Sequence, residues 1–106
     1  MQFALPLDPD RDALEARWLT LTRNILPSVA AARAWPVTED HCFQRILLDV
    51  ACAGRWYDTI RGRPAYAHAP DAILAQAVAL GEAALAGEAD VHALNRQSLR
   101  WRGKLT

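Results

Sequence analysis

The sequence predicts an all-α protein, a compact bundle of about four to five helices in a single domain over residues 1–106. Two observations carry this prediction. Apolar residues recur at helical spacing along most of the chain, and no segment shows the sustained alternation with β-branched residues that is typical of strands. The length of 106 residues suits one domain, and contents of 52% hydrophobic and 23% charged residues are ordinary for a globular protein.

The first predicted helix begins at the segment DPD, residues 8–10, which supplies an Asp cap and a proline at the first helical position. The residues on its predicted inward face are Leu14, Trp18, Leu21 and Ile25. We expect Pro27 to end or kink this helix and residues 28–34 to form a short second helix or its continuation. The Trp-Pro pair at 35–36 then breaks it, because a residue before proline avoids the α region.

The longest predicted helix is central, covers about residues 39–61 and is capped by Thr38. Its apolar stripe consists of Phe43, Ile46, Leu47, Val50, Ala53, Gly54, Tyr57 and Ile60. Because this stripe runs through Gly54, one long helix is favoured over two short ones, although glycine inside a helix costs about 1 kcal/mol relative to alanine. The segment RGRP, residues 61–64, is predicted to end the helix.

An alanine-rich helix is predicted over about residues 71–86, where Gln76 and Glu82 are the only polar side chains after the first residue. A helix that is apolar nearly all round is either central in its domain or shared between subunits, and the sequence leaves both interpretations open. The expected partner is therefore a second copy of the chain, in a homodimer through this helix.

The last predicted helix is capped by Asp90 and ends near Gly103. Four of its residues are placed on the inward side: Val91, Leu94, Ser98 and Trp101. On the outward side the spacing predicts a basic stripe of Arg96, Arg100 and Lys104. The favoured interpretation is a solvated face that suits the helix dipole, and the alternative is weak binding of a nucleic acid or an acidic protein.

Buried polar side chains need partners, and the last helix directs Asn95, Ser98 and Arg102 inward. We expect Asp49 to accept hydrogen bonds from Arg102, or from Arg45 one turn earlier. A structural polar network is the favoured interpretation of these residues. The alternative is a small polar pocket for a ligand, lined by Arg45, Asp49, Trp56, Asn95 and Arg102.

The charges sum to zero, so the molecule as a whole is not a polyanion binder. The N-terminal residues MQFALPLDPD lack the basic lead and apolar stretch of a signal peptide, and no apolar run is suited to span a membrane. Cys42 and Cys52 would lie about 15 Å apart on one helix, beyond the reach of a disulfide. These features predict a cytoplasmic, bacterial-type protein.

Metal and catalytic motifs are not recognised in the sequence. The histidines and cysteines do not match zinc-ligand spacing, and Cys42 is interpreted as a small core residue rather than a nucleophile. No nucleophile elbow, phosphate loop or dinucleotide fingerprint occurs. We therefore expect no catalytic residue, metal or cofactor, and the chain is more in keeping with a non-enzyme.

The run HCFQRILLDVACAGRWYDTI, a Pro-Ala connector, the Ala-rich helix and LNRQSLRWRGK together resemble a group of small bacterial proteins with no established activity, over about residues 40–104. The shared pattern falls on Cys42, Phe43, Arg45, Ile46, Leu48, Asp49, Gly54, Trp56, Leu94, Asn95, Ser98, Leu99, Trp101, Arg102, Gly103 and Lys104. Some members are described as acetyltransferase-related. The coenzyme A loop of those enzymes, Arg/Gln-x-x-Gly-x-Gly/Ala between a strand and a helix, is matched in residues 100–105 only at Arg100 and Gly103.

Three functions follow from these features, in decreasing order. The first is an interaction or regulatory protein that acts through protein contacts. The second is a weak nucleic-acid-binding module that uses the basic stripe, with Arg61 and Arg63 beside it. The third is a small-ligand binder or enzyme that uses the polar pocket around Asp49.

Overall fold

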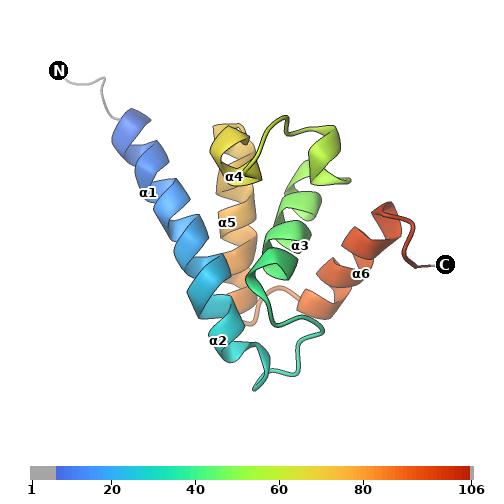
Figure 1. Ribbon diagram of the computed structural model, residues 1–106. Helices are drawn as coiled ribbons and strands as arrows, with labels where there is room; N and C mark the ends of the chain where they lie inside the picture. The colour runs from blue at the N-terminus through green and yellow to red at the C-terminus, as the bar shows by residue number, and fades with distance from the viewer. Residues whose placement is uncertain (1–6, 106) are drawn as a thin grey trace.

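The computed structural model describes the backbone of residues 7–105, and it confirms the all-α prediction because no strand occurs in this part of the chain. The helices form a bundle in which α5 lies behind the space between α1 and α3, and α6 lies on the other side of α3 (Figure 1). The α-helices are α1 (Leu7–Thr20), α2 (Leu26–Ala30), α3 (Asp40–Cys52), α4 (Ala65–His68), α5 (Asp71–Leu85) and α6 (Val91–Trp101). Two shorter elements are the π-helix η1 (Leu21–Ile25) and the 3-10 helix η2 (Trp56–Asp58).

The first helix starts at Leu7, one residue before the predicted cap, and its helical path does not end at Pro27. Instead, the π-helix η1 joins α1 to α2 directly. The N–H of Leu26 bonds the carbonyl of Leu21, five residues back, and Pro27 has no N–H to donate. The helix therefore continues through a wider turn and ends at Ala30, before the Trp-Pro pair, as expected.

The predicted long helix over 39–61 is wrong, because α3 ends at Cys52. Ala53 adopts a left-handed conformation with φ of 56°, and the N–H of Gly54 bonds the carbonyl of Asp49 at 3.1 Å. The Asp49 side chain adds a local reason for the turn, since its Oδ1 accepts a hydrogen bond from the backbone N–H of Trp56 at 2.9 Å. A continuing helix would have used that N–H within its own backbone.

The alanine-rich helix α5 runs from Asp71 to Leu85, as the sequence predicts, and packs against both α1 and α3. Its buried residues are Leu74, Ala77, Val78, Gly81 and Ala84. A Cβ added at Gly81 would lie 3.3 Å from side-chain carbons of Leu21 and Leu47, so the small residue permits close packing. The central position accounts for the apolar composition of α5, and the homodimer stays a prediction.

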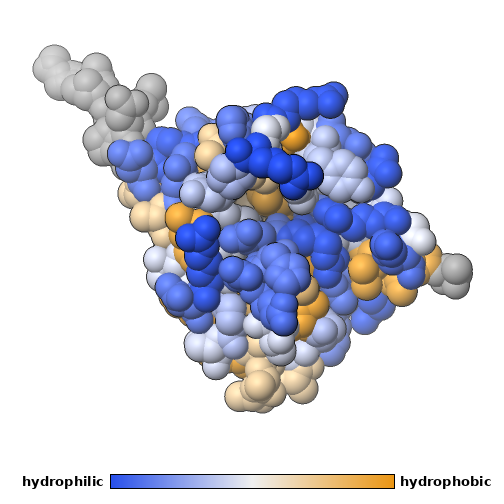
Figure 2. All heavy atoms as spheres, in the orientation of Figure 1, coloured by the Kyte–Doolittle hydropathy of each residue, from blue (hydrophilic) through white to orange (hydrophobic). Residues whose placement is uncertain are grey.

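The surface of the bundle is mainly polar on the side that faces the viewer. Figure 2 shows hydrophilic residues over most of this face, with apolar residues in smaller separate areas. Among the helices of the described chain, none has the length and apolarity needed to cross a membrane.

Helix α6 begins and ends with the signals that the sequence supplies. The Asp90 carboxylate accepts a hydrogen bond from the N–H of Ala93 at 3.2 Å. At the other end Gly103 has φ of 71°, and the N–H of Lys104 bonds the carbonyl of Leu99 at 2.8 Å. Between these ends α6 packs on α3, and two of its three buried residues, Asn95 and Ser98, are polar. The contact between α3 and α6 is therefore built around polar side chains, which form the site described next.

Candidate anion-binding pocket

Asp49 on α3 is fully buried and lies at the centre of the polar network between α3 and α6. Its Oδ2 accepts hydrogen bonds from Arg102 Nε at 2.7 Å and from Ser98 Oγ at 2.7 Å. Its Oδ1 accepts from Arg102 Nη2 at 2.9 Å and from the backbone N–H of Trp56 at 2.9 Å. The predicted contact between Asp49 and Arg102 is thus present, and its two parallel hydrogen bonds fix the plane of the guanidinium.

Arg45, one turn before Asp49 on α3, bonds two neutral side chains rather than the carboxylate. Its Nη1 donates to Ser98 Oγ at 2.7 Å, and its Nη2 donates to Asn95 Oδ1 at 2.8 Å. Ser98 accepts from Arg45 and donates to Asp49, so its hydroxyl links the two charged groups. Within the described residues no ion pair neutralises Arg45, although its position is held by two hydrogen bonds.

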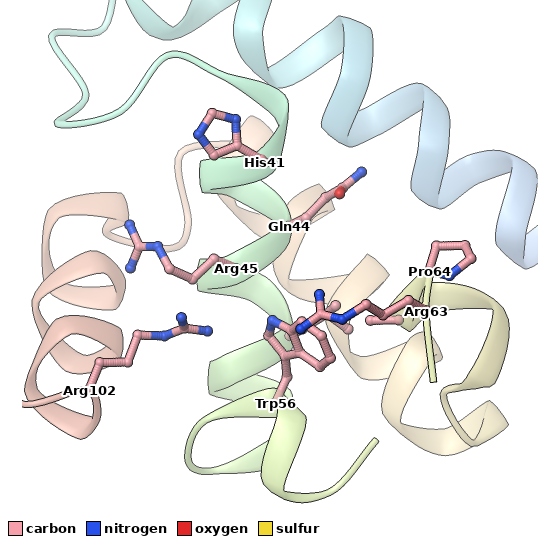
Figure 3. Close-up of a pocket in the computed structure, with 9 residues that line it drawn as sticks. His41, Gln44, Arg45, Trp56, Arg63, Pro64 and Arg102 are labelled. Carbon is pink, nitrogen blue, oxygen red and sulfur yellow. The ribbon is translucent and has the colours of Figure 1, made fainter. Parts of the chain in front are cut away.

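A cavity of about 410 Å³ opens beside this network, between α3, α6, η2 and the start of α4. Figure 3 shows Arg45 and Arg102 on one side of it, while the side chain of Arg63 reaches over Trp56 from the other side. Among the described residues nine line the cavity: His41, Gln44, Arg45, Leu48, Trp56, Arg63, Pro64, Ala65 and Arg102. Three segments that are distant in the sequence therefore each supply one arginine.

Aromatic rings hold two of these arginines in place. The Cζ of Arg63 lies 5.2 Å from the centroid of the Trp56 ring, and the Cζ of Arg102 lies 5.2 Å from that of Tyr57. The Trp56 and Tyr57 rings meet edge to face, with centroids 5.6 Å apart. These contacts restrict both guanidinium groups before any ligand binds.

The electrostatics of the cavity are positive. In the described part of the chain none of the lining residues carries a carboxylate, and Asp49 beneath them neutralises Arg102 alone. The hydrogen bonds from Arg102 to Asp49 raise the pKa of this arginine above its ordinary value, so it stays charged. His41 lies at the rim with a side chain that is 71% exposed, near carboxylate oxygens of Glu39 and Asp40. The remaining charges of Arg45 and Arg63 attract anions and repel metal cations.

All five residues of the predicted pocket or network lie in this region. Arg45, Trp56 and Arg102 line the cavity, whereas Asp49 and Asn95 lie beneath it and bond the arginines. Ser98, which the sequence places on the inward side, is the fully buried link between them. The network and the pocket are therefore two parts of one arrangement.

The predicted basic stripe is only partly formed. Arg96 and Arg100 are exposed on α6, and neither lines the cavity. Lys104 follows the left-handed residue Gly103, where the helix has already ended, so it does not extend the stripe by a helical turn. The prediction of three cations at continuous helical spacing is wrong for Lys104.

Sequence reasoning missed the contribution of the segment before α4. Residues 61–64 were interpreted as a helix stop, and the structure places Arg63 and Pro64 in the cavity wall. One signal was available, because Arg63 follows a tryptophan in a loop that also bears Arg61 and Arg55. In the described part of the chain no cluster of histidine, cysteine, aspartate or glutamate is arranged to hold a metal ion.

No protein-family model matches this chain, and no curated protein or solved structure is significantly similar to it. The resemblance to small bacterial proteins stays a prediction. The functional argument consequently depends on the geometry and charge of the cavity.

Proposed function

We propose that this protein binds a small organic anion in the cavity between α3, α6 and the start of α4. The observation that supports this function best is the composition of the wall, which joins three arginines with no carboxylate among the described lining residues. Anions are held in proteins by such groups, because guanidinium hydrogen bonds to oxyanions are charge-assisted.

Free hydrogen-bond donors support the proposal. A guanidinium group has five N–H donors. Arg45 uses two of them on Ser98 and Asn95, and Arg102 uses two on Asp49, so in the described structure each keeps 5 − 2 = 3 for a ligand. These two arginines are fixed by their protein partners, which lowers the entropy lost when an anion binds.

The size and apolar part of the cavity favour an organic molecule over a bare inorganic ion. Pockets for small molecules commonly measure about 300–1,000 Å³, and this cavity of about 410 Å³ lies in that range. Four apolar or aromatic residues complete the wall: Leu48, Trp56, Pro64 and Ala65. A ligand with one anionic end and one apolar end matches both parts.

Among the three functions expected from the sequence, the ligand-binding one is now favoured. Action through protein contacts stays a prediction, as does weak nucleic-acid binding by Arg96 and Arg100. The cavity offers binding and orientation, and His41 at its rim is the lining residue whose ordinary pKa lies nearest neutrality. We therefore propose binding rather than catalysis.

Isothermal titration calorimetry with benzoate, phenyl sulfate and phenyl phosphate, at low ionic strength, tests the proposal. Saturable binding of at least one compound is expected. Arg63→Ala should weaken it by about tenfold, the effect of losing one charge-assisted contact. Arg61→Ala is the matched control, because Arg61 is exposed in the same loop and does not line the cavity. Absence of binding for all three compounds would contradict the proposed function, and so would equal effects of the two variants.

A further inference from the structure

We propose that the ligand of this cavity is a phosphate monoester, bound as its dianion, with a small apolar group on the ester oxygen. This inference rests on the proposed function and adds the chemical class of the ligand. It follows from the number of unmatched charges, the directions of the donors and the apolar wall.

Charge is the first reason. Arg102 and Asp49 form a neutral pair, whereas within residues 7–105 no ion pair involves Arg45 or Arg63. The cavity therefore holds two positive charges without a protein counter-charge. A carboxylate or a sulfate monoester would neutralise one of them, and a phosphate monoester above about pH 6 would neutralise both.

Donor geometry is the second reason. Arg45 and Arg102 reach the cavity from one side, and Arg63 reaches it from the other (Figure 3). A carboxylate presents two oxygens in one plane, which suits one or two arginines. A phosphate monoester presents three terminal oxygens in a tetrahedral arrangement, so it can accept from three guanidinium groups that approach along different directions.

The apolar wall supplies the third reason. Leu48, Pro64 and Ala65 line the same cavity, next to the indole of Trp56. An inorganic phosphate ion would leave this surface in contact with water. An ester group of modest size would cover it, and this adds hydrophobic stabilisation to the charge-assisted contacts.

The pH dependence of binding separates a phosphate monoester from the other anions. Its second ionisation lies near about pH 6, so its affinity should rise as the pH increases through this value. Carboxylates and sulfate esters are already ionised there and should not gain affinity. The charged groups at the cavity are Arg45, Arg63, Arg102 with its partner Asp49, and the rim residues His41, Glu39 and Asp40. Of these, His41 titrates nearest this range, and its protonation would favour every anion at low pH, which is the opposite trend.

The experiment compares phenyl phosphate, phenyl sulfate, benzoate and inorganic phosphate by calorimetry, at about pH 7.5 and about pH 5. Wild-type protein and His41→Gln are both titrated, so that the ligand and the histidine are distinguished. At the higher pH we expect phenyl phosphate to bind at least about tenfold more tightly than phenyl sulfate, which has the same shape and one charge fewer. At the lower pH this preference should fall to about twofold in both proteins.

Arg63→Ala provides a second readout that does not depend on the pH. Arg63 is exposed and its removal leaves Asp49, Arg45 and Arg102 bonded as before, so the variant is expected to fold. With one unmatched charge left, the preference for phenyl phosphate over phenyl sulfate should largely disappear, whereas Arg61→Ala should retain it.

Each outcome has a defined meaning. Equal or tighter binding of phenyl sulfate or benzoate at the higher pH would overturn the phosphate assignment and leave the proposed anion-binding function intact. Inorganic phosphate that binds as tightly as phenyl phosphate would overturn the apolar ester group. Absence of binding for all four compounds would reject both the assignment and the proposed function.

Discussion

The carboxylate of Asp49 on α3 accepts two hydrogen bonds from the guanidinium of Arg102, which follows the last residue of α6. Asp49 is fully buried, and the side chain of Arg102 is 19% exposed. This pair fastens the end of α6 to α3 and at the same time directs the free N–H groups of Arg102 to the cavity. Stability and the candidate function therefore depend on the same contact.

Asp49→Asn should lower the free energy of unfolding by about 3 kcal/mol or more, because it leaves Arg102 without its counter-charge in a largely buried position. Urea unfolding followed by circular dichroism measures the change. Asp58→Asn is the control, since the pair of Asp58 with Arg55 is about half exposed and should hardly move the urea midpoint. In a double-mutant cycle, additive effects of Asp49→Asn and Arg102→Gln would show that the two residues do not stabilise each other.

Ser98→Ala should destabilise the protein by about 1–3 kcal/mol, because Asp49 loses a donor and Arg45 loses an acceptor in a buried setting. Ser28→Ala removes a hydrogen bond of the same length, 2.7 Å to the carbonyl of Ile25, from an exposed position. The control should change the unfolding free energy by less than about 0.5 kcal/mol. If chemical denaturation gives equal losses for the two variants, the hydroxyl of Ser98 is not the link assigned to it.

Ala53→Gly should stabilise the protein by about 0.5–1 kcal/mol, because glycine adopts the left-handed conformation of this residue without the penalty that a Cβ carries. The same change at Ala75, which is exposed inside α5, should instead cost about 1 kcal/mol. Thermal and urea unfolding report both variants. A loss of stability at Ala53 would contradict the end of α3 at Cys52 and would favour the longer helix predicted from the sequence.

The predicted homodimer through α5 has a narrow surface available to it, since the exposed residues within the helix are Asp71, Ala72, Ala75, Gln76 and Ala79. If the dimer forms there, light scattering should give twice the mass of one chain, and Ala79→Arg should return the mass of a single chain. Arg23→Ala, on an exposed part of η1, is a control that should leave the mass unchanged. A single-chain mass for the wild-type protein would remove the prediction.

The sequence was sufficient for the fold class and for the ends of the later helices, because these depend on local signals. The alanine-rich helix, the Asp90 cap and the left-handed Gly103 are all where the sequence predicts them. The end of α3 was not predictable from the apolar stripe. A stripe records which residues are buried, and Ile60 is buried even though the chain has turned at Ala53 to bring it there.

The candidate site was predicted in part for a similar reason. Asp49 and Arg102 could be paired because a buried carboxylate and an inward arginine each need a partner. Arg63 could not be placed, since its position depends on the path of the loop between η2 and α4. That path is set by tertiary packing, including the contact of Arg63 with the ring of Trp56.

Nuclear magnetic resonance of the arginine Nε–H groups, during a titration with phenyl phosphate, tests the central claim most directly. The account predicts that the resonances of Arg45, Arg63 and Arg102 shift and saturate together with a single affinity. Those of Arg96 and Arg100, which are exposed on α6 outside the cavity, should stay unchanged and serve as internal controls. Shifts confined to Arg96 and Arg100, or no saturable shift at any arginine, would contradict an anion-binding cavity between α3 and α6.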